Sequence, residues 1–144
     1  MFPMKIKLNP AFYPDNQSLV ITALDPGKVL GVATALLGKV SPGIWECKFH
    51  SCTYRFPEDT KALADVELSV SDVVIVETWR LFPHKAKQLI GDDLIGPQCR
   101  GYIIGKLWET GQQDKLVHQS PSDKEHVDIE AIRNWVGENW GSSQ

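Results

Sequence analysis

The sequence predicts a single α/β domain over residues 1–144, built on a mixed sheet with flanking helices. Two apolar stretches, residues 19–24 and 30–37, are joined tightly through Asp-Pro-Gly, which indicates an antiparallel hairpin of two strands. Residues 73–76 are four consecutive β-favouring residues, a pattern typical of a strand with both faces covered. Helical and strand patterns alternate around this strand, and that order predicts a layered α/β domain.

Between the hairpin and the apolar strand, the sequence predicts one further strand and one helix. Residues 43–56 alternate in a period of two, with Trp45 and Cys47 on one face, so we expect a third strand there. Residues 56–70 have apolar side chains at helical spacing and acidic residues at the start, where the helix dipole favours them.

Three more elements are predicted after the apolar strand. Residues 91–111 are expected to form a helix of small and apolar residues, and residues 114–119 a short strand. Residues 120–140 are expected to form a last helix, since Ser122 and Glu125 have the spacing of a capping box.

Composition and charge narrow the class of protein. The formal net charge of -3 argues mildly against a general nucleic-acid binder, although it leaves a local basic surface open. Cys47, Cys52 and Cys99 lack CxxC spacing, so neither a disulfide framework nor a zinc site is indicated. No stretch approaches the roughly 20 apolar residues of a membrane span or the pattern of a signal peptide. We therefore expect a soluble cytoplasmic protein with no membrane partner.

Two acidic residues occupy matching places at the ends of predicted strands. Asp25 ends the first strand of the hairpin, and Glu77 ends the apolar strand. If the two strands are neighbours, the two carboxylates converge and repel unless a cation lies between them, and oxygen ligands suit Mg²⁺ or Mn²⁺. Divalent ions in such a site support phosphodiester cleavage. The alternative for each acid alone is a turn former at Asp25 and a solvated exit residue at Glu77.

A basic and aromatic segment, residues 78–88, follows Glu77 directly. Its cationic side chains are candidate phosphate contacts and its aromatic rings could stack on an unpaired base of DNA. For the two aromatic residues, a place in the core or in a dimer interface is the favoured explanation. For the cationic residues, phosphate contact is favoured over a solvated loop. These candidates are Trp79, Arg80, Phe82, His84, Lys85 and Lys87.

Three stretches, residues 21–37, 72–88 and 116–127, together resemble the RuvC-like Holliday-junction resolvases of the RNase H-like superfamily, most closely the short resolvase-like proteins of bacteriophages. The resemblance implies an RNase H-like fold with Asp25 and Glu77 as catalytic carboxylates that bind Mg²⁺ or Mn²⁺. It also implies Lys124 as a DNA contact. The expected partners are branched DNA, above all a four-way junction, and a second copy of the chain in a homodimer.

The chain departs from the family in its last acidic residues. In the family, acids on a final helix complete the metal site, and no matching motif lies within the 144 residues. We expect either such a helix beyond Gln144, or Asp128 as a substitute ligand, or an incomplete centre. An incomplete centre would make the protein a catalytically silent module that binds DNA junctions. A third possibility, an actin-like or sugar-kinase-like nucleotide-binding half, requires a second phosphate-binding hairpin that the sequence does not show.

Overall fold

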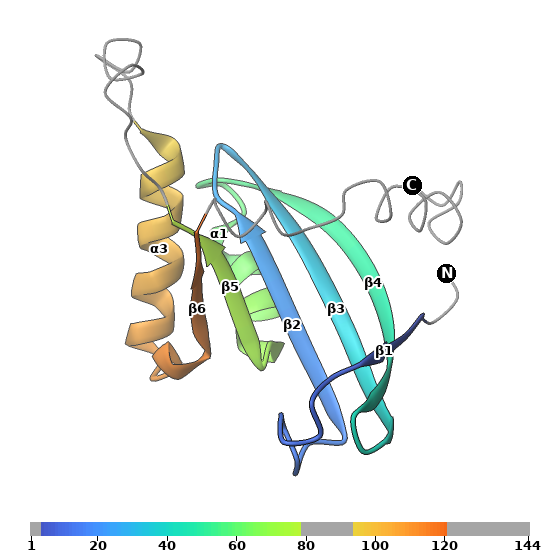
Figure 1. Cartoon of the computed structure of the whole chain (residues 1–144). Helices are drawn as coiled ribbons and strands as arrows, with labels where there is room; N and C mark the ends of the chain where they lie inside the picture. The colour runs from blue at the N-terminus through green and yellow to red at the C-terminus, as the bar shows by residue number, and fades with distance from the viewer. Residues whose placement is uncertain (1–3, 79–93, 121–144) are drawn as a thin grey trace, which may run out of the picture.

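The computed structural model describes residues 4–78 and 94–120 of the chain (Figure 1). Six strands form one mixed sheet in the order β1-β4-β3-β2-β5-β6, with helices packed against it, which confirms the predicted α/β class. The strands are β1 (Met4–Lys7), β2 (Ser18–Asp25), β3 (Val29–Ser41), β4 (Ile44–Arg55), β5 (Val73–Glu77) and β6 (Leu116–Gln119). The helical segments are α1 (Thr60–Ala62), η1 (Leu63–Leu68), α3 (Ile95–Glu109) and η3 (Gln113–Lys115).

Strands β2, β3 and β4 form an antiparallel meander, so the predicted hairpin and the third strand are confirmed. The second strand of the hairpin is longer than residues 30–37, because it continues to a tight turn before β4. Gly43 makes this turn with φ of +78°, and a Cβ there would lie 2.9 Å from the carbonyl oxygen of Leu8. A side chain at this position would therefore meet both backbone strain and a steric clash.

Strands β5 and β6 extend the sheet in the parallel direction. Strand β5 pairs with β2 from Ile21↔Val73 to Leu24↔Val76, and β6 pairs with β5 up to Glu77↔Gln119. The carboxyl ends of β2, β5 and β6 therefore meet at the same edge of the sheet, which is where open α/β sheets commonly bind ligands.

The helices cover one face of the sheet. Val74 and Val76 on β5 are fully buried, as are Ile103 and Leu107 on α3, and these residues belong to one core cluster. A second, smaller cluster lies on the opposite face, where Leu19 and Leu37 accompany Trp45 and Cys47. Because side chains alternate along each strand, β2 contributes Leu24 to the first cluster and Leu19 to the second.

The helix predicted for residues 56–70 begins at Thr60, and its central part is a π-helix, η1. The buried residues of η1 are Leu63, Ala64, Glu67 and Leu68. They form two pairs four residues apart, and the wider i→i+5 winding brings both pairs onto the same face toward the sheet. One of these four inward-facing residues, Glu67, is acidic.

Strand β1 was not expected from the sequence. It pairs antiparallel with β4 at the edge of the sheet, with Met4 opposite Cys47 and Lys7 opposite Ile44. Lys5 and Lys7 belong to this strand, and lysines on an edge strand discourage pairing with a further chain.

Some predictions lie outside the described part of the chain. These include the helix expected over residues 120–140 and the segment after Thr78. Among the described helices, none is long and apolar enough to cross a membrane.

Candidate functional site

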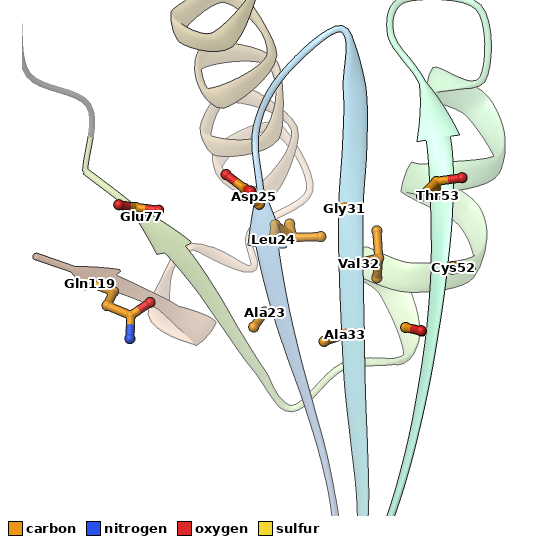
Figure 2. A pocket seen from close by; sticks show the side chains of 11 residues that line it. Ala23, Leu24, Asp25, Gly31, Val32, Ala33, Cys52, Thr53, Glu77 and Gln119 are labelled. Atoms are coloured by element: carbon orange, nitrogen blue, oxygen red, sulfur yellow. The ribbon is translucent and has the colours of Figure 1, made fainter. Parts of the chain in front are cut away.

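The register of the sheet aligns five side-chain positions in one row across five strands. Asp25 pairs with Gly31, Gly31 pairs with Thr53, and on the other side Glu77 pairs with Gln119. Asp25 and Glu77 each follow the last paired position of the parallel strands β2 and β5. The row, which we call the carboxylate row, is Thr53, Gly31, Asp25, Glu77 and Gln119. Figure 2 shows these residues at the ends of their strands.

The carboxylate row lies on the face of the sheet opposite the helices. Leu24 and Val76, the residues just before the two acids, are almost fully buried against the helical layer. Alternation along a strand therefore directs Asp25 and Glu77 to the other face. The structure brings these two sequence-predicted acids onto neighbouring strands, which lie about 4.8 Å apart in a sheet.

A pocket of about 610 Å³ lies over the carboxylate row. That volume is within the range of about 300–1,000 Å³ that small-molecule sites occupy. Besides Asp25, Glu77 and Gln119, its lining consists largely of small residues on β2, β3 and β4, whose short side chains leave the space open (Figure 2). These residues are Ala23, Gly31, Ala33, Ser51 and Thr53.

Gly31 contributes most directly to the space beside Asp25. A Cβ built at Gly31 would lie 3.6 Å from the Cβ of Asp25, which is ordinary van der Waals contact. An alanine therefore fits at this position, whereas a longer side chain would extend into the pocket beside the carboxylate. The absence of a side chain at Gly31 keeps Asp25 accessible from the β3 side.

The ends of the strands are tied to their neighbours by hydrogen bonds. The backbone N–H and the hydroxyl of Thr78 both donate to the carbonyl oxygen of Gln119, at 2.8 and 3.2 Å. On the other side, the N–H of Phe56 donates to the carbonyl oxygen of Lys28 in the hairpin turn at 2.9 Å. Burial raises the pKa of the Cys99 thiol on α3, and a hydrogen bond with the backbone of Gly27 in the same turn opposes that rise. These contacts hold the chain segments that adjoin the two acids.

Asp25 and Glu77 could supply two carboxylates to a hard cation at this site. Within residues 4–78 and 94–120, no group of three or more His, Cys, Asp or Glu side chains could hold a metal ion. Asp128, the expected third acidic ligand, lies outside the described residues. His118 belongs to the opposite face, where its Nδ1 lies 2.9 Å from a guanidinium nitrogen of Arg100.

A buried polar cluster under the sheet was not expected from the sequence. The carboxyl group of Glu67, only 5% exposed, accepts hydrogen bonds from the Tyr54 hydroxyl at 2.9 Å, the Thr34 hydroxyl at 3.4 Å and the Cys52 thiol at 3.5 Å. Burial and the neighbouring Glu67 raise the pKa of both Tyr54 and Cys52. In the sequence, this cluster is indicated by Glu67, an acid among the apolar positions of the helix predicted over residues 56–70.

Cys52 connects this cluster to the carboxylate row. It bonds to Glu67 on the helical side of the sheet, and it also contributes to the wall of the pocket. Its neighbour in β4, Thr53, belongs to the row. The Glu67 cluster therefore holds β4 against the helix directly behind one wall of the pocket.

The predicted DNA contacts lie outside the described residues. These residues are Trp79, Arg80, Phe82, His84, Lys85, Lys87 and Lys124. Comparison of the chain with models of protein families, with curated proteins and with solved structures found no match.

Proposed function

We propose that this protein is a metal-dependent, structure-selective DNA endonuclease of the RNase H-like type. Its substrate would be branched DNA, such as the four-way junctions that Holliday-junction resolvases cleave during recombination or phage DNA processing. The observation that supports this proposal best is the pair of acids, Asp25 and Glu77, at the ends of neighbouring parallel strands on the open face of the sheet.

The order of the strands supports the RNase H-like assignment. Three antiparallel strands, β4-β3-β2, are followed in the sheet by two parallel strands, β5 and β6. Helical segments separate β4 from β5 and β5 from β6 along the chain. The acids end the first strand of the meander and the strand parallel to it, as the resemblance to RuvC-like resolvases implies.

The residues of the site fit Mg²⁺ or Mn²⁺. Both acids present oxygen atoms, which these ions prefer, and the pocket has room for a phosphodiester beside them. A bound divalent ion would supply an activated water and would stabilise the oxygen that leaves. The chain itself would orient the ion through the two carboxylates, while Gly31 keeps the approach to Asp25 open.

Binding of the DNA would depend on the segment that follows Glu77. Arg80, His84, Lys85 and Lys87 provide cationic donors within ten residues after Glu77 in the sequence, and such donors recognise phosphates. A homodimer would place two such centres on the two strands that are cut in a four-way junction.

The test is cleavage of a synthetic four-way junction by the full chain in millimolar Mn²⁺. We expect Asp25→Asn and Glu77→Gln to abolish cleavage and to retain junction binding, because each change removes a metal ligand without altering the strand. Asp114→Asn is the matched control, since this exposed acid lies before β6, at the opposite end of the strand. Undiminished cleavage by Asp25→Asn would refute the proposed site. Junction binding without any cleavage by the wild-type chain would instead indicate a catalytically silent binding module.

A further inference from the structure

Gln119 is the position next to Glu77 in the carboxylate row, and no sequence motif singles it out. It pairs with Glu77 in the register of β5 and β6, so both side chains lie on the same face of the sheet. It also lines the same pocket as Asp25 and Glu77. Figure 2 shows Gln119 on β6 next to β5, with its side-chain amide directed away from the carboxylate of Glu77 in the conformer drawn.

Gln119 can provide the third oxygen ligand that Asp25 and Glu77 lack. Its amide carbonyl is an oxygen ligand without charge, of a kind that hard cations accept together with carboxylates. The main chain of Gln119 is already held, because its carbonyl oxygen accepts two hydrogen bonds from Thr78. The strand therefore stays in place whichever side chain occupies position 119, and that side chain begins one strand spacing from Glu77.

We propose that Gln119 is the third oxygen ligand of the divalent cation, completing with Asp25 and Glu77 a set of two carboxylates and one amide. This inference rests on the proposed function, because it concerns the same ion. It predicts that a side chain on β6, and not only an acid after residue 120, determines the affinity for the cation.

The effect of a new carboxylate at position 119 on cation affinity must be distinguished from the effect of a new carboxylate elsewhere in the pocket. Thr53 provides the matched position, since it lies in the same row and lines the same pocket. However, Thr53 is two strands away from Asp25, about 10 Å by the usual strand spacing. At physiological salt a new carboxylate at that distance is screened and should change cation affinity by less than about threefold.

The experiment is calorimetric titration of the full chain with Mn²⁺ in the absence of DNA. We expect Gln119→Ala to weaken Mn²⁺ binding by about tenfold, the lower end of what losing a supporting group costs a metal site. We expect Gln119→Glu to strengthen binding by about tenfold or more, because a carboxylate replaces the neutral ligand. Thr53→Glu should remain within about threefold of the wild type.

A second measurement, the unfolding temperature with EDTA and with Mn²⁺, shows whether a variant only perturbs folding. In the presence of EDTA, Gln119→Glu should unfold at a lower temperature than the wild type because three carboxylates repel one another. Millimolar Mn²⁺ should raise its unfolding temperature more than that of Thr53→Glu, because tighter binding to the folded state stabilises it more.

The outcomes separate this inference from the proposed function. If Asp25→Asn loses Mn²⁺ binding while Gln119→Ala retains wild-type affinity, the cation site stands and Gln119 is not a ligand. Equal gains in Gln119→Glu and Thr53→Glu would also overturn the inference, because they would reflect charge alone. If the wild-type chain binds no Mn²⁺ at all, the inference and the proposed metal site both fail.

Discussion

Removal of the Tyr54 hydroxyl tests whether the Glu67 cluster holds the sheet and the π-helix together. Tyr54→Phe deletes the donor that lies 2.9 Å from Glu67 and leaves the ring in place. A hydrogen bond to a charged group contributes about 1.5–3 kcal/mol to stability. Tyr54 is only partly buried, so water can replace some of that contribution, and we expect a loss of about 1–2 kcal/mol.

Glu67→Gln should cost more than Tyr54→Phe. The carboxyl group accepts bonds from Tyr54 and Cys52 at one oxygen and from Thr34 at the other. Whichever carboxyl oxygen of Glu67 the amide nitrogen replaces, one donor then faces another donor. The residue is only 5% exposed, so water cannot readily supply the missing acceptor. We expect a loss of about 2–3 kcal/mol, since a buried polar group is left unsatisfied.

The assay is urea unfolding of the two variants and of the double variant Tyr54→Phe with Glu67→Gln. The double variant should lose less than the sum of the two changes, with a coupling of about 1–2 kcal/mol. Tyr102→Phe is the control, because the Tyr102 hydroxyl donates to the carbonyl oxygen of Thr60 at 3.1 Å rather than to Glu67. Its effect should add to that of Glu67→Gln. Additive losses for Tyr54→Phe and Glu67→Gln would refute the reasoning, since the two groups would then not act on one another.

Three further predictions concern pH, the pocket and DNA binding. The pKa values of Tyr54, Cys47, Cys52 and Cys99 are all raised, chiefly by burial, so the folded state favours their neutral forms. The stability that these groups contribute is complete below their unfolded pKa values. The free energy of unfolding should therefore fall above about pH 8.5 for the thiols and above about pH 10 for Tyr54. Tyr54→Phe should flatten the second of these declines. Gly31→Leu should fill the pocket beside Asp25 and reduce Mn²⁺-dependent cleavage, while Gly31→Ala retains it; equal rates for all three chains would show that the pocket is not used. Neutralising Arg80, Lys85 and Lys87 should weaken junction binding and reduce the slope of log K against log salt by about 0.9 per lost phosphate contact, and an unchanged slope would exclude these residues.

Much of the fold follows from patterns that are local in the sequence. The hairpin of β2 and β3 is set by two apolar stretches around one tight turn, and β5 is identified by consecutive β-favouring residues such as Val74 and Val76. Strand β1 has only four residues, so its alternation of Met4 and Ile6 with Lys5 and Lys7 is too short to identify a strand. It is stabilised by pairing with β4, and that pairing is a property of the folded sheet.

The π-helix could not be predicted for a related reason. Apolar residues at Leu63, Ala64 and Leu68 fit an ordinary helix as well as a wider one. What distinguishes the two is Glu67, which must reach Tyr54 on β4 to have a partner in the core. A buried acid needs hydrogen bonds, and the donors here come from two different strands, so the local winding depends on tertiary contacts.

The candidate site shows the same division between local and long-range information. Asp25 and Glu77 can be recognised from sequence because each ends a strand that is itself recognisable. Gln119 becomes significant only through register, since a shift of β6 by one residue would turn His118 toward the pocket instead. The contact between His118 and Arg100 of α3 holds the imidazole on the helical face, and alternation then places Gln119 on the pocket face. The pairing of β6 with β5 fixes this register, and the contact with Arg100 on the helical layer supports it. Weakening that contact with Arg100→Met should therefore lower Mn²⁺ affinity less than Gln119→Ala does, although it alters no residue that lines the pocket. An equal loss of affinity would show that this contact alone sets the register.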